Sequence, residues 1–167
     1  MTITRDRLLS RVVAPGCLGL IVVLDALCLL FFLPGENASA LEITFALSVT
    51  LISPIVGVLI VWQHARHPVG WLLIAHGLLN APMMAGDGWA DFAVRHQEHV
   101  WGVALETQLS QGMWPNLYLC IALVAYVFPD GHFYSPRWRR WTLVCLAGYL
   151  VFMVAAVWVL TARTRRA

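Results

Sequence analysis

Residues 17–33 read Cys-Leu-Gly-Leu-Ile-Val-Val-Leu-Asp-Ala-Leu-Cys-Leu-Leu-Phe-Phe-Leu, an apolar run with one charged side chain, Asp25. Together with the residues from Val12 onward, the run covers 12–33. An α-helix rises about 1.5 Å per residue, so about 20 residues cross a hydrocarbon layer about 30 Å thick. A backbone in lipid must satisfy its own hydrogen bonds, and a helix does so within one segment. We therefore predict a membrane-spanning helix at 12–33.

Four more apolar runs follow, at 41–62, 69–86, 113–129 and 141–161. Hydrophobic residues make up 60% of the 167-residue chain and charged residues 12%, whereas about a quarter of a typical soluble domain is charged. The predicted fold class is an all-α integral membrane protein, with one domain over 1–167 that forms a bundle of about five transmembrane helices. The polar stretch 87–112 is predicted as a short amphipathic segment on the outer surface, with Asp91 and Arg95 as an ion pair.

The arginines predict the orientation of the chain. All eleven basic residues are arginine, and arginine is enriched in cytoplasmic loops. A cytoplasmic N-terminus places most of them inside, which predicts a multi-pass protein of the inner (cytoplasmic) membrane. The tail from Arg163 fits this scheme less well, so a sixth span missing from this chain is one alternative. A second alternative is that 1–40 is a cleaved secretory signal.

Polar residues within the spans are the first candidates for a functional site, because a polar group in hydrocarbon is costly and should face protein or water. Counted along their helices, Asp25 and Asn80 lie at a similar depth, and Thr50 and Tyr118 lie within a turn or two of it. These four residues predict an intramembrane polar pocket in the outer half of the bundle. The alternative is that they only hold helices together.

Histidines are the second set of candidates. His76 lies mid-span without a second histidine inside a span, so we expect a hydrogen-bonded core histidine rather than a haem ligand. His96 and His99 are weak candidates for metal ligands, since no third ligand is evident. The four cysteines all lie in apolar runs and are expected to be free thiols. We expect no cofactor.

Two connecting loops carry distinctive motifs. The first is His67-Pro68-Val69-Gly70-Trp71-Leu72-Leu73, and the second runs from Phe128-Pro129-Asp130-Gly131 through Ser135-Pro136 to Arg137-Trp138-Arg139. Proline, aspartate and glycine favour a sharp turn after a helix, and arginine with tryptophan anchors a span at the headgroups. A turn followed by an anchor accounts for these residues without an active site.

These motifs resemble the N-terminal membrane region of bacterial sensor histidine kinases, in which a Pro-(Ile/Val)-Gly-Trp-Leu-Leu element opens one span and a Phe-Pro-Asp-Gly element follows another. The resemblance extends over nearly the whole chain. It implies a helical input module that in such kinases is followed by another span and a cytoplasmic kinase core. The phosphoacceptor histidine helix and the ATP lid are absent from this sequence, so we expect no enzymatic activity.

The function predicted first is therefore a non-catalytic membrane sensor or input module, with a truncated member of the kinase group as one form of it. The expected partners are membrane lipids and either a second copy of the chain or a kinase-type signalling protein, and no nucleic acid. The alternative is a small structural or assembly subunit of a membrane complex. A transporter is less favoured, because the sequence has no inverted repeat.

Overall fold

The structure is a computed structural model, and it describes residues 8–32, 39–96, 115–127 and 135–164. Its elements are a π-helical turn η1 (Leu9–Val13) and the helices α2 (Ala14–Phe32), α3 (Ala40–Gln63), α4 (Pro68–Arg95), α6 (Asn116–Val127) and α7 (Pro136–Thr164). No strand occurs in these ranges, so the all-α prediction is confirmed. By length and composition, four helical segments can cross a membrane: Ser10–Phe31, Ile43–Gln63, Pro68–Arg95 and Pro136–Ala155, with a shorter apolar helix at Tyr118–Val127.

The helix starts follow from proline and serine. Pro68 is the first residue of α4 and Pro136 the first of α7, the position at which a missing backbone N–H costs nothing and a fixed φ suits the helix. Before α7, the Ser135 hydroxyl accepts a hydrogen bond from the Trp138 amide at 3.4 Å. The loop motifs therefore set where these two helices begin.

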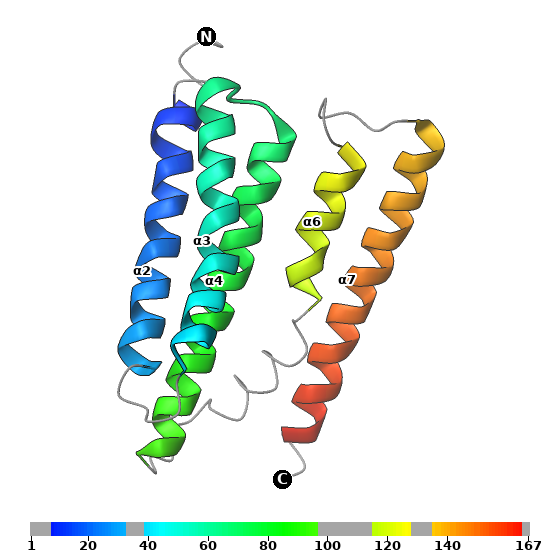
Figure 1. Ribbon diagram of the computed structural model, residues 1–167. Coiled ribbons are helices and arrows are strands. Elements are labelled where there is room, and N and C mark those ends of the chain that lie inside the picture. Colours follow the sequence, from blue (N-terminus) through cyan, green and yellow to red (C-terminus); the bar gives the residue numbers. More distant parts are fainter. Residues whose placement is uncertain (1–7, 33–38, 97–114, 128–134, 165–167) are drawn as a thin grey trace.

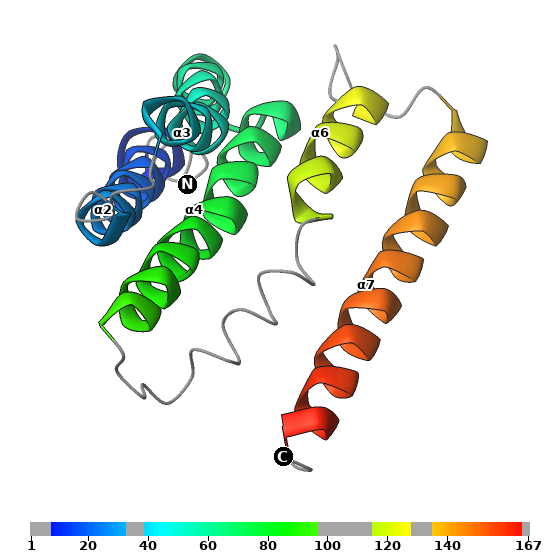
Figure 2. The same ribbon diagram turned by 60° about the horizontal axis from the view of Figure 1, so that its bottom comes forward.

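Successive helices run in opposite directions, and α4 lies at the centre of the bundle (Figure 1). Helix α4 packs against α2, α3 and α6, whereas the main contact of α7 among the described residues is with α6. The second view shows the same separation of α7 from the α2–α3–α4 group (Figure 2). We call α2, α3 and α4 the three-helix core.

Apolar side chains fill the three-helix core and also cover its outside. Ile21, Val61 and Ile74 are buried where the three helices meet. Large apolar side chains are nevertheless exposed on every long helix, among them Leu30, Phe45 and Val151. Water would not favour so large an exposed apolar surface.

The segment 87–112 differs from its prediction. Helix α4 does not end at 86 but continues to Arg95, so the first residues of the expected outer segment belong to the third long helix. Gly88, Ala90 and Ala93 are buried, and this packing keeps the polar-looking stretch helical. The predicted Asp91–Arg95 ion pair is confirmed at 2.9 Å. Residues 97–112 lie outside the described residues.

The start of the last long helix also differs. The span was predicted from 141, but α7 begins at Pro136. Arg137, Trp138 and Arg139 thus form its first turn rather than a separate anchor before it. Their side chains are exposed on this first turn, and Pro136 suits the first helical position because its fixed φ matches the helix.

Candidate functional site

Asp25 on α2 and Thr50 on α3 meet inside the three-helix core. The Thr50 hydroxyl donates a hydrogen bond to the Asp25 carboxyl at 2.9 Å. Asp25 is 4% exposed and Thr50 is 1% exposed, so the contact is closed off from the surroundings. A carboxyl group in apolar surroundings needs such a donor, because burying it without one costs several kcal/mol. Two of the four predicted pocket residues are therefore in direct contact.

A second polar contact lies one turn further along α3. The Ser53 hydroxyl and His76 Nδ1 on α4 are 2.7 Å apart, and His76 is 2% exposed. This confirms the expectation of a hydrogen-bonded core histidine. Because Thr50 and Ser53 are three residues apart, they project from nearby positions on one side of α3. Helix α3 thus contacts α2 through a hydroxyl–carboxyl pair and α4 through a hydroxyl–imidazole pair.

Asn80 is buried in the same core but directs its amide along its own helix. Asn80 Nδ2 donates to the backbone oxygen of His76 at 2.7 Å. The sequence correctly placed Asn80 in the interior of the bundle, and the structure shows this amide bonded within α4. His76 and Asn80 together give α4 a buried polar stripe beside the Asp25–Thr50 contact.

Tyr118 does not join this cluster. It lies in the first turn of α6 and is 59% exposed. A residue count along a helix gives its depth, but not the direction in which its side chain projects. The predicted four-residue pocket is therefore replaced by two interhelical contacts formed by Asp25, Thr50, Ser53 and His76, with Asn80 beside them.

Three glycines bring the helices of the core close enough for these contacts. A Cβ atom on Gly57 of α3 would lie 2.6 Å from the Gly70 oxygen, and one on Gly77 of α4 would lie 2.7 Å from Pro54 Cγ and 2.8 Å from Ile21 Cδ1. These distances are shorter than real side chains allow. The seven-residue spacing of Gly70 and Gly77, which places them on one face of α4, is the sequence signal that points to this contact.

The first loop motif has a structural role in the same place. Pro68 starts α4, Gly70 lies against Val61 and Gly57 of α3, and the Trp71 indole Nε1 donates to the Ala65 backbone oxygen at 2.8 Å. The motif thus closes the turn between α3 and α4 and sets their separation. Of the second motif, Pro129, Asp130 and Gly131 lie outside the described residues, while the Trp138 ring lies 5.5 Å from that of Tyr126.

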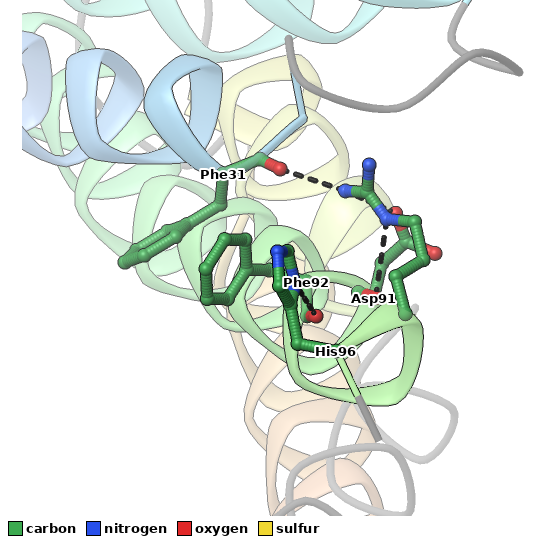
Figure 3. A network of polar contacts seen from close by, with 5 residues as sticks. Phe31, Asp91, Phe92 and His96 are labelled. Atoms are coloured by element: carbon green, nitrogen blue, oxygen red, sulfur yellow. Dashed lines mark hydrogen bonds and ion pairs between the residues drawn. The ribbon is translucent and has the colours of Figure 1, made fainter. Parts of the chain in front are cut away.

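Arg95 connects α4 to α2 at the other end of the core. Its guanidinium lies 2.9 Å from the Asp91 carboxylate and donates to the Phe31 backbone oxygen near the end of α2 at 2.7 Å (Figure 3). The Phe31 and Phe92 rings are 5.5 Å apart, and the Phe92 and His96 rings 4.1 Å apart. A cation at a helix C-terminus stabilises the unpaired carbonyl groups there. The sequence predicted the ion pair but not the contact with α2.

Of the two weak metal candidates, the structure describes His96. The His96 Nδ1 atom lies 2.9 Å from the Phe92 backbone oxygen, and His99 lies outside the described residues. Within the ranges that the structure describes, no three His, Cys, Asp or Glu side chains are grouped to hold a metal ion. The described cysteines Cys17, Cys28, Cys120 and Cys145 are free thiols.

No protein-family model matches the chain, and neither a curated protein nor a solved structure is found to be similar to it. The candidate site must therefore be interpreted from its own chemistry. It contains a carboxyl group and an imidazole, both able to take up or release a proton, and each is bonded to a hydroxyl on the helix between them. Such an arrangement can change its hydrogen bonding when a proton or a polar ligand arrives.

Proposed function

We propose that this chain is a multi-pass protein of the cytoplasmic membrane, with a cytoplasmic N-terminus, that acts as a non-catalytic input module of the sensor-kinase type. The membrane placement is supported by four long apolar helices with large apolar side chains on their outer surfaces. The observation that carries the signalling role is the pair of buried interhelical contacts, Asp25–Thr50 and Ser53–His76. The loop motifs that resemble those of sensor kinases point in the same direction.

The proposed mechanism is a change in the packing of the three-helix core. A stimulus shifts a protein between two arrangements only if it interacts more favourably with one of them. Protonation of the carboxyl or imidazole, or a polar ligand that competes for the Thr50 and Ser53 hydroxyls, satisfies this condition because it alters a contact between helices. The close glycine contacts turn a local change into a shift of whole helices, since atoms already in contact cannot absorb it.

A distance measurement in lipid nanodiscs tests this proposal. Spin labels at Leu20 on α2 and Leu59 on α3, both exposed, report the separation of these helices. An input module predicts two distances whose populations change between pH 5 and pH 8, and Asp25→Asn should remove the change while the protein remains folded. Ser48→Ala serves as the matched control, because the Ser48 hydroxyl bonds only within α3, to the Thr44 oxygen.

The second candidate, a structural or assembly subunit, is favoured by one observation. Helix α7 exposes a long apolar surface, including Val151, Val154 and Trp158, and its main contact with the described bundle is with α6. A subunit predicts a single interhelical distance at every pH and a stoichiometric complex that survives detergent extraction. Val151→Asn should then dissociate that complex and leave the three-helix core intact.

A further inference from the structure

The structure contains a cavity that the candidate site does not use. It has a volume of about 500 Å³ and is lined by Ser10, Arg11 and Trp62. Ser10 and Arg11 belong to the π-helical turn η1, and Trp62 belongs to the last turn of α3. The cavity therefore lies where the start of the first long helix meets the end of the second, at the upper end of the bundle in Figure 1. Its volume is that of a site for a small ligand.

The side chains of the cavity suit an anion. Arg11 is exposed, so its guanidinium is available to a ligand, and guanidinium binds phosphate through two parallel hydrogen bonds. Ser10 also lines the cavity and is buried. The Trp62 side chain is 58% exposed, and an indole has an apolar body with a polar N–H, the combination found at the headgroup level of membranes.

The distribution of charged residues also favours an anionic ligand. Among the described residues, this end of the bundle carries Arg11, Arg66, Arg137, Arg139 and Arg140, whereas the described acidic residues Asp25, Glu42, Asp87 and Asp91 lie mid-helix or toward the opposite end. A positive field over one end attracts anions and increases their local concentration.

We propose that this cavity is a binding site for a phosphate group, and specifically for the anionic headgroup of a phospholipid in the leaflet that surrounds this end of the bundle. Arg11 pairs with the phosphodiester, and the Trp62 ring packs against the glycerol backbone. An acyl chain can then follow the exposed apolar side chains that come after Arg11 in the sequence, Val12 and Val13 of η1 and Leu20 of α2. The lipid placement rests on the membrane insertion proposed above but not on the signalling role.

Native mass spectrometry of the full-length chain in neutral detergent tests this site. Phosphatidylglycerol is titrated as the probe, with phosphatidylcholine as the zwitterionic lipid and inorganic phosphate as the free anion. We expect a first phosphatidylglycerol to bind at least tenfold more tightly than phosphatidylcholine. Arg11→Gln should weaken phosphatidylglycerol binding about tenfold, the change expected when one charge-assisted contact is lost. Arg139→Gln removes an exposed arginine of α7 at the same end of the bundle and should weaken phosphatidylglycerol binding less than about twofold.

The outcomes separate the possible ligands. Selective phosphatidylglycerol binding that Arg11→Gln removes and inorganic phosphate does not displace supports the lipid site. Displacement by millimolar phosphate supports a phosphate site whose ligand is soluble. Equal binding of the two lipids, or equal losses in the Arg11 and Arg139 variants, overturns the proposal. Arg11→Lys retains the charge without the two-pronged geometry and should give an intermediate affinity, and because Arg11 is exposed, neither variant disturbs the core.

Discussion

Ser53 and His76 allow the most direct test of an interhelical contact in this protein, because one hydroxyl and one imidazole lie 2.7 Å apart between α3 and α4. Ser53→Ala removes the hydroxyl and leaves the imidazole nitrogen without this partner. Hydrogen bonds between helices in membranes contribute about 0.5–1.5 kcal/mol, and we expect a loss of that size in unfolding titrations with a denaturing detergent. Ser48→Ala, which removes a bond within one helix, should cost less than about 0.5 kcal/mol. Equal losses in the two variants would contradict an interhelical role for Ser53.

Gly57 tests whether close approach of the backbones holds the core together. In Gly57→Ala the new methyl group would lie 2.6 Å from the Gly70 oxygen and 3.0 Å from Ile74. Since a backbone oxygen cannot rotate away, the helices must separate, and overpacking of this kind costs about 1–3 kcal/mol. Gly148→Ala on α7 meets nothing within 4 Å and should be neutral or stabilising by up to about 1 kcal/mol. The free energy of unfolding of both variants checks the difference.

The candidate site shows what a single sequence reveals at the residue scale. Depth along a helix follows from counting, so Asp25 and Thr50 were correctly expected to come close. Which side of a helix faces its neighbours depends on how the helices pack. In a nearly uniform apolar helix the apolar residues are spread around the axis, so the sequence pattern does not indicate that side. For that reason Tyr118 was wrongly included, and the Ser53–His76 contact was not predicted.

Among the elements, α4 departs most from its predicted length, and the reason is its central position. A helix surrounded by α2, α3 and α6 needs fewer apolar residues than one facing outward on most sides, so its polar last turns look like a loop in the sequence. Gly86 and Gly88 lie inside this helix, and neither ends it. By contrast α2 and α3 were predicted to within about three residues, because nearly continuous apolar runs mark both.

Arg95 provides a prediction at the scale of elements, since it joins the last turn of α4 to the end of α2. Arg95→Gln removes the charged contact with the Phe31 oxygen, and we expect hydrogen exchange of the last amides of α2 to become about threefold to tenfold faster, a loss of about 1 kcal/mol of local stability. Asp91→Asn removes only the ion pair. The Asp91 side chain is 51% exposed, so this variant should change the exchange rates of these amides little. Equal acceleration in both variants would show that the ion pair, rather than the contact with α2, joins these ends.

At the scale of the whole molecule, the alternation of the helices makes a prediction about sidedness. The start of α2, the turn between α3 and α4 and the start of α7 lie at one end of the bundle, and the end of α4 lies at the other (Figure 1). The first end carries most of the described arginines, which favours the cytoplasmic side. In the proposed membrane placement, Arg66 and Asp91, both exposed, should therefore lie on opposite sides of the membrane.

Cysteine labelling in intact cells measures this directly. Asp91→Cys should react with a membrane-impermeant maleimide added outside, whereas Arg66→Cys should react only after the cells are opened. The native cysteines serve as an internal control, because all four described thiols lie within helices and lipid would shield them from a polar reagent. Reaction of both introduced cysteines from the same side would contradict the spanning arrangement of α4, since this one helix connects the two positions. Reaction of Arg66→Cys alone from outside would instead preserve the span and reverse the orientation, which would place the proposed phospholipid site in the outer leaflet.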